Sequence, residues 1–197
     1  IMLFIISQRM CQNTEYPELR DALDVRYSSY FASLGINILP ISNNPNTTKQ
    51  ILDKVKPEGI ILSGGNDLNE FAVREHTEDK LIEFCIKKNK PIIGICRGAQ
   101  KLNQYFGGSA NKIQGHVGTL HEIWDHRERL SASVNSFHNY GICKHTLSAE
   151  LLPICYSNDG SIEAFRHIDM PILGVMWHPE RMNDACVVFE NLMKEVL

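Results

Sequence analysis

A short apolar run that ends at a cysteine between two glycines constrains the fold of this chain most. Ile92–Ile95 is typical of a buried strand, and a helical pattern begins directly after Cys96. Gly94 and Gly98 have no Cβ, so this tight turn predicts a strained backbone at Cys96 and a side chain clear of the sheet. The N-terminus of a helix favours a thiolate there. A buried structural cysteine is the alternative interpretation.

Strand and helix patterns alternate through the first half of the chain. We expect strands at 2–7, 36–41, 58–62 and 92–95, and helices at 18–34, 47–55, 75–89 and 97–106. This alternation predicts right-handed βαβ units and a doubly wound parallel sheet.

The pattern changes after Gly107-Gly108. Residues 116–124, 130–135, 152–157, 162–166 and 172–177 have strand patterns without long helices between them, and 183–196 has the pattern of a closing amphipathic helix. Asn158-Asp159-Gly160 is typical of a hairpin turn. The prediction is an α/β fold with a doubly wound, mostly parallel sheet flanked by helices, an added antiparallel β segment, and a single domain over residues 1–197.

Composition narrows the class of protein. A length of 197 residues suits one domain, and a net charge of -3 argues against general nucleic-acid binding. The apolar N-terminus is too short for a membrane span and has no basic leader, so we expect no membrane association. The six cysteines form no C-x-x-C pair, which predicts free thiols, no zinc site and a reducing cytoplasm.

A second motif, Trp177-His178-Pro179-Glu180, follows the last apolar strand. The His178 imidazole is placed to take the proton of the Cys96 thiol, and Glu180 to orient that imidazole. A polar turn after a strand is the alternative.

A third motif, Ser63-Gly64-Gly65, offers a backbone amide for a developing oxyanion, with the Arg97 amide as a second donor. A plain turn is the alternative there.

Six separated motifs together resemble the class I glutamine amidotransferase-like superfamily, and more closely its γ-glutamyl hydrolase branch. The resemblance covers nearly the whole chain and implies a flavodoxin-like fold. The motifs are Ile61-Leu62-Ser63-Gly64-Gly65-Asn66-Asp67, Arg74 with Glu78, Gly94-Ile95-Cys96-Arg97-Gly98-Ala99-Gln100, Val134-Asn135-Ser136-Phe137-His138, Asp159-Gly160-Ser161-Ile162-Glu163-Ala164 and His178-Pro179-Glu180.

The resemblance implies a catalytic triad and a thioester intermediate. Cys96 attacks a γ-glutamyl carbonyl, His178 acts as base and then as acid, and Glu180 orients it. The amides of Gly65 and Arg97 hold the oxyanion. The residues implied in substrate binding are Arg9, Gly64, Gln100, Asn135, Ser136 and His138. The implied substrate is a small γ-glutamyl conjugate, with no cofactor, no metal and no obligate protein partner.

Two departures from the family pattern concern the leaving amine. His138-Asn139-Tyr140 stands where many γ-glutamyl-γ-aminobutyrate hydrolases have His-His-Gln, and the loop after Asp67 is shorter than theirs. The chain looks closer to small hydrolases that release cytidine diphosphoramidate for capsule phosphoramidate synthesis. A phosphate-bearing leaving group favours cations near Cys96. The cations considered are Arg74, Arg97, Lys101, His121 and Arg127, with solvated surface charge as the alternative for each.

Three further interpretations follow from the same residues. The spacing of His116, His121 and His126 fits neither a helix face nor a strand face, so we expect no metal there. A glutaminase subunit that passes ammonia to a partner synthase is the alternative function. A ligand sensor on the same scaffold is a third hypothesis, and the presence of cysteine, histidine and glutamate together argues against it.

Overall fold

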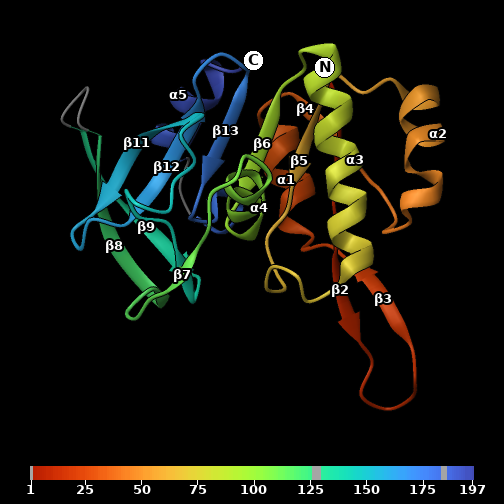
Figure 1. Cartoon of the computed structure of the whole chain (residues 1–197), viewed down its shortest axis with the longest axis horizontal. Helices are drawn as coiled ribbons and strands as arrows, with labels where there is room; N and C mark the ends of the chain where they lie inside the picture. The colour runs from red at the N-terminus through yellow and green to blue at the C-terminus, as the bar shows by residue number, and fades with distance from the viewer. Residues whose placement is uncertain (1, 126–129, 183–185) are drawn as a thin grey trace.

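The protein is built on a nine-stranded sheet, shown in Figure 1 in a computed structural model that describes residues 2–125, 130–182 and 186–197. One half of the sheet is parallel and holds β4 (Ile36–Pro40), β1 (Met2–Ile6), β5 (Gly59–Leu62), β6 (Ile92–Ile95) and β13 (Ile172–Val175), in that order. The other half is antiparallel and continues with β12 (Ile162–His167), β11 (Leu151–Ser157), β8 (Val117–Asp125) and β9 (Leu130–Phe137).

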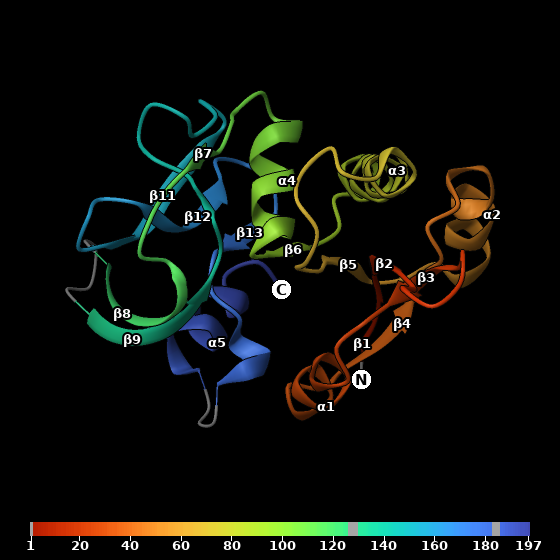
Figure 2. The same cartoon turned by 90° about the horizontal axis from the view of Figure 1, so that it is seen from below.

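Helices cover both faces of the sheet, as Figure 2 shows. One face carries α1 (Arg26–Ser33) and α5 (Val187–Lys194), where the rings of Phe31 and Phe189 lie 6.4 Å apart. The other face carries α2 (Pro45–Val55), α3 (Ala72–Lys88) and α4 (Arg97–Tyr105), which bury Leu52, Leu81 and Leu102. These two apolar layers confirm the predicted doubly wound α/β fold.

Local chemistry sets where the helices start and stop. The Asn44 side chain accepts a hydrogen bond from the Asn46 amide at the start of α2, and Pro45 occupies the first turn. Lys56 caps the end of α2 and Asn89 caps the end of α3, each in the left-handed conformation. Pro91 follows two residues after Asn89 and separates α3 from β6.

The predicted helix over 18–34 is wrong in its first half. There β3 (Leu19–Ala22) pairs with β2 (Arg9–Gln12) in a hairpin that projects from the end of the sheet (Figure 1), and α1 begins only at Arg26. Leu19 has the spacing of a buried helical residue, yet it is 46% exposed. This hairpin continues from β1, so it sets the direction in which Arg9 leaves the sheet.

The remaining elements are short. β7 (Asn111–Lys112) pairs with β10 (Tyr140–Gly141), and a 3-10 turn covers Pro179–Arg181. The hairpin predicted at Asn158-Asp159-Gly160 is confirmed between β11 and β12. The start of the predicted helix 183–196 falls on residues 183–185, which lie outside the described residues. In the described ranges, no helix is both long enough and apolar enough to cross a membrane.

Candidate active site

Cys96 occupies the turn that joins β6 to α4, at the carboxyl end of β6. Its backbone has φ 53° and ψ -110°, an uncommon conformation for a residue with a side chain. A Cβ on Gly94 would lie 2.7 Å from the Gly98 carbonyl oxygen, and a Cβ on Gly98 would lie 2.0 Å from the Leu62 carbonyl oxygen. The two glycines therefore permit the close strand–helix approach and the strained turn that the sequence predicts.

His178 reaches the same place from the neighbouring strand. β13 pairs in parallel with β6, and the Cys96 amide donates to the Val175 carbonyl oxygen at 2.7 Å. A Cβ built on Gly64 would lie 2.7 Å from His178 Cε1 and 3.5 Å from Cys96 Cβ. The ends of β5, β6 and β13 thus bring Gly64, Cys96 and His178 into contact.

A carboxylate fixes the orientation of the imidazole. His178 Nδ1 lies 2.7 Å from Glu180 Oε1, and both side chains are buried. Burial lowers the pKa of the His178 imidazole, but hydrogen bonding to Cys96 and Glu180 outweighs burial and raises that pKa to about 9. The imidazole is therefore protonated at neutral pH and lies beside the cysteine sulfur.

Asn135 holds the backbone of His178 rather than lining the pocket. Its side-chain amide donates to the His178 carbonyl oxygen, and its oxygen accepts from the His178 amide, both at 2.8 Å. Ser136 is fully buried, and its hydroxyl donates to the His116 carbonyl oxygen at 2.6 Å. The structure therefore places both residues behind the cavity wall.

The side chains of Cys96 and His178 face an open cavity of about 330 Å³. The sequence-predicted residues that line it are Arg9, Gly65, Cys96, Arg97, Gln100, His138 and His178. Gly65 has φ +80°, and neither its amide nor the Arg97 amide donates to another described residue. Gly64 lines an adjoining pocket, and its amide donates to the Tyr27 hydroxyl oxygen at 3.2 Å.

A family model described as "Glutamine amidotransferase class-I" matches residues 25–190. The chain belongs to the class I glutamine amidotransferase family. It is 34% identical over 193 residues to the gamma-glutamyl-CDP-amidate hydrolase of Campylobacter jejuni, with 92% of each chain covered. It is also 34% identical over 145 residues to a glutamine-hydrolyzing GMP synthase subunit of Methanococcoides burtonii, covering 70% of this chain and 71% of that one.

A solved structure shares the fold. The crystal structure of a glutamine amidotransferase from Thermotoga maritima matches with a TM-score of 0.65 and 18% identity, over 91% of this chain and 77% of that one. The class I glutamine amidotransferase fold expected from the motifs is thereby confirmed. The Campylobacter jejuni relative supports a γ-glutamyl hydrolase within the family.

Several positively charged residues considered above as phosphate ligands form buried ion pairs in the structure. Arg97 pairs with Glu75 and Glu78, and Arg74 pairs with Glu78 at 3.0 Å. Arg74 also donates to the carbonyl oxygens of residues 63–65, so it holds the loop that presents the Gly65 amide.

Two more of these residues face carboxylates. Lys101 lies 3.0 Å from Glu75 and 2.7 Å from Asp79. His121 faces Glu163 at 3.5 Å, and Arg127 lies outside the described residues. Arg74, Arg97 and Lys101 are buried and ion-paired, so they fit neither a free cation for phosphate nor the alternative, a solvated surface charge.

Arg181 is a cavity residue that the sequence analysis missed. Its guanidinium lies 5.2 Å from the centre of the Phe137 ring, and both residues line the cavity with Arg9. Tyr140 also lines the cavity, and its carbonyl oxygen accepts from the Gln100 side-chain amide at 2.9 Å. Arg181 directly follows His178-Pro179-Glu180, and this position next to the motif is the sequence feature that could have predicted its place in the cavity.

Proposed function

We propose that this member of the class I glutamine amidotransferase family hydrolyses the γ-glutamyl amide bond of a small conjugate and releases glutamate. The observation that carries the proposal is the convergence of Cys96 and His178 on one cavity, with Glu180 bonded to the far imidazole nitrogen. A nucleophile, a proton carrier and an orienting carboxylate are the parts that acyl transfer needs.

The reaction begins with attack of the Cys96 sulfur on the γ-carbonyl carbon. The carbonyl π electrons move to oxygen, and the amides of Gly65 and Arg97 stabilise that oxyanion. The raised pKa of His178 keeps a proton on the imidazole at neutral pH. His178 gives this proton to the amide nitrogen as the carbon–nitrogen bond breaks, which leaves a γ-glutamyl thioester and a free amine.

Water completes the turnover. Neutral His178 takes a proton from a water molecule that attacks the thioester carbon. The carbon–sulfur bond breaks, glutamate leaves, and His178 again carries its proton beside the sulfur. Glu180 keeps the imidazole in the orientation that both steps require.

The charges of the cavity favour a γ-glutamyl conjugate that carries phosphate, and γ-glutamyl-CDP-amidate is the substrate we propose. Arg9 and Arg181 supply two guanidinium groups, which suit phosphate oxygens. Arg181 Nε also lies 3.5 Å from Asp24 and from Glu180, which is longer than the pairs of Arg74 and Lys101, and its side chain is 26% exposed. Among the described residues, none forms an ion pair with Arg9. Asp67 and Glu70 also line the cavity and suit the α-ammonium of a glutamyl group. The Campylobacter jejuni relative, named for this substrate, supports the same choice.

A substrate panel tests the proposal. Purified protein is given γ-glutamyl-CDP-amidate, γ-glutamyl-γ-aminobutyrate and glutamine, and free glutamate is measured. We expect the nucleotide conjugate to have the highest kcat/KM and Cys96→Ala to release none. Loss of one charge-assisted bond of about 1.5–3 kcal/mol in Arg9→Ala or Arg181→Ala predicts a roughly 10- to 100-fold lower kcat/KM for that conjugate.

The second hypothesis is a glutaminase subunit that passes ammonia to a synthase, favoured by the match to the GMP synthase subunit of Methanococcoides burtonii. It predicts that glutamine is the best substrate and that turnover depends on a second protein. Turnover of the nucleotide conjugate by the isolated chain would exclude this hypothesis. Equal turnover of all three substrates would contradict the proposed nucleotide specificity and leave the hydrolase intact.

A further inference from the structure

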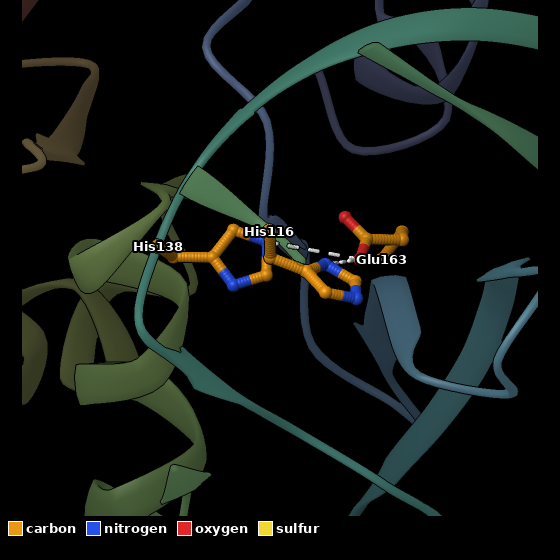
Figure 3. A group of neighbouring side chains, drawn as sticks. All are labelled: His116, His138 and Glu163. Carbon is orange, nitrogen blue, oxygen red and sulfur yellow. Dashed lines mark ion pairs between the residues drawn. The ribbon is translucent and has the colours of Figure 1, made fainter. Parts of the chain in front are cut away.

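A cluster of buried imidazoles and a carboxylate adjoins the cavity through His138, and the proposed reaction does not use it. Figure 3 shows His116, His138 and Glu163, which come from the loop before β8, the end of β9 and the strand β12. All three are at least nine-tenths buried, at 5%, 3% and 0% exposure. One ligand atom from each lies within 4.8 Å of the other two.

The hydrogen bonds around the cluster decide which imidazole nitrogens carry protons. His138 Nδ1 lies 2.9 Å from the Tyr140 carbonyl oxygen, and His116 Nε2 lies 2.9 Å from Asp159 Oδ2. Both oxygens only accept, so these nitrogens donate. In the neutral imidazoles, His138 Nε2 and His116 Nδ1 are then left with lone pairs.

Both lone-pair nitrogens face the same carboxylate. His116 Nδ1 lies 3.5 Å and His138 Nε2 lies 3.7 Å from Glu163 Oε1. These atoms are buried and have no hydrogen-bond partner in the part of the chain that the structure describes. Separations of this size are longer than N–H···O hydrogen bonds, which are about 2.7–3.2 Å. Acceptors that face one another without a donor need either a proton or a metal cation between them.

The two nitrogen–carboxylate separations, 3.5 and 3.7 Å, are close to those of a metal-bound set, and the three ligand atoms, which lie within 4.8 Å of one another, would draw together around an ion. At zinc–ligand distances of about 2.0–2.1 Å, two ligand atoms of a tetrahedral site lie roughly 3.3–3.4 Å apart. The hydrogen bonds to the Tyr140 carbonyl and to Asp159 are the outer contacts that orient metal-binding imidazoles. Imidazole and carboxylate ligands suit a divalent d-block ion rather than Mg²⁺ or Ca²⁺.

We propose that His116 Nδ1, His138 Nε2 and Glu163 Oε1 bind one divalent d-block cation of the Zn²⁺ type. His121 is adjacent, with its Nε2 3.5 Å from Glu163 Oε2 and without a hydrogen-bond partner among the described residues. Two histidines and a glutamate are an established zinc ligand set.

A β-bulge explains why sequence spacing argued against this site. His116 and His121 are five residues apart, which on a regular strand puts them on opposite faces. The pairing of β8 with β9 shifts register between Val117 and Thr119, and Gly118 has φ +66°. The extra residue turns both imidazoles to one face, with ring centres 4.8 Å apart. His126, the third histidine of the spacing argument, lies outside the described residues.

The cation would hold the wall of the cavity. His138 lines the cavity, and its Nδ1 shares the Tyr140 carbonyl oxygen with the Gln100 side chain. A metal that fixes His138 therefore also fixes the position of Tyr140 and Gln100. This is a positioning role, because the proposed cysteine chemistry needs no Lewis acid.

Zinc binding by the full chain tests the site directly. The protein carries Cys96→Ala, so that the cysteine–histidine pair cannot capture zinc, and is stripped with a chelator before titration with Zn²⁺. We expect one tight equivalent per chain and a Tm that rises with Zn²⁺. His116→Asn or Glu163→Gln should weaken binding about 100-fold or more. The exposed His145→Asn is the matched control and should bind as tightly as the parent.

Two further measurements test the site even if His116→Asn or Glu163→Gln fails to fold. Co²⁺ bound to the parent should give the strong visible absorption of a four-coordinate ion. Asp159→Asn changes the outer partner of His116 and keeps an amide oxygen for the Ser157 and Ser161 hydrogen bonds, so it should weaken Zn²⁺ binding about 10- to 100-fold. The proposal is overturned if the parent takes up no stoichiometric Zn²⁺, or if folded His116→Asn and Asp159→Asn bind it as tightly as the parent. A proton-linked imidazole–carboxylate network would then occupy this place.

Discussion

Three residues hold the imidazole of His178: a carboxylate, a side-chain amide and a glycine. Glu180 bonds to its Nδ1 at 2.7 Å, and Asn135 makes two hydrogen bonds to its backbone. On the third side the ring rests against Gly64, where a side chain is missing. Each contact makes a separate prediction, because each fixes a different property of the ring.

Gly64→Ala should displace the imidazole with little loss of stability. The added Cβ would lie 2.7 Å from His178 Cε1, so the ring must move away from Cys96. A misplacement of about 1 Å predicts a roughly 100-fold lower kcat. Gly107→Ala is the control, because its Cβ meets nothing within 4 Å but its φ is +89°. It should lower Tm and keep full activity. Equal activity of the two variants would contradict the contact.

The pH profile reports the proton on His178. Because the pKa of His178 is raised from 6.5 to about 9, its proton stabilises the fold fully below pH 6.5, and that stabilisation is lost as pH rises through 9. We expect kcat/KM to fall over the same alkaline range, since the leaving amine then has no proton donor. Glu180→Gln should shift this fall to lower pH, whereas the exposed Glu83→Gln should leave it in place. An unchanged pH profile in Glu180→Gln would contradict the prediction that Glu180 raises the pKa of His178.

At the scale of elements, α3 and α4 are joined by buried charges. Glu78 is fully buried and bonds to Arg74 and Ser7, at 3.0 and 2.9 Å, and to Arg97. Glu78→Gln leaves the two guanidinium charges short of a carboxylate, which predicts a loss of about 3–5 kcal/mol in the free energy of unfolding. Urea unfolding at pH 7 measures it.

The dependence of the free energy of unfolding on pH in acid tests the same interface independently. Burial raises the pKa of the Glu78 carboxyl, but Arg97 and Arg74 outweigh burial and hold that pKa below its usual range. The stabilisation is therefore present above pH 4.5 and is lost as pH falls through the lowered pKa. The difference between Glu78→Gln and the parent should shrink in acid. Glu18→Gln, in an exposed pair, should change stability at neither pH.

Elements with strong periodicity were predictable from the sequence, and irregular ones were not. The buried strand before Cys96 and the helices after 45 and 72 follow from apolar spacing and end signals. The hairpin of β2 and β3 was missed, because its few apolar residues happen to have helical spacing. The bulge at Gly118 and the cavity position of Arg181 depend on strand pairing and on turn geometry, which no local pattern encodes.

The whole molecule places its cavity where the parallel and antiparallel halves of the sheet meet. Arg9 follows β1, and Cys96 follows β6, both in the parallel half. His138 follows β9 in the antiparallel half, at the far edge of the sheet order. A ligand that fills this cavity contacts segments distant in sequence, so it binds the native fold and not the unfolded chain.

Ligand binding should therefore raise the stability of the whole chain by mass action. In Cys96→Ala, which cannot turn the substrate over, γ-glutamyl-CDP-amidate at 100 times its Kd should add about 2.7 kcal/mol, or roughly 5–10 °C in Tm. Adding Arg9→Ala should raise the concentration needed for the same shift about 10- to 100-fold, because one cation of the cavity is lost. The conjugate and CDP alone, compared by thermal unfolding, separate the contribution of the glutamyl group from that of the phosphates. A Tm that does not respond to the conjugate would contradict the proposed substrate while leaving the cysteine chemistry open to other γ-glutamyl amides.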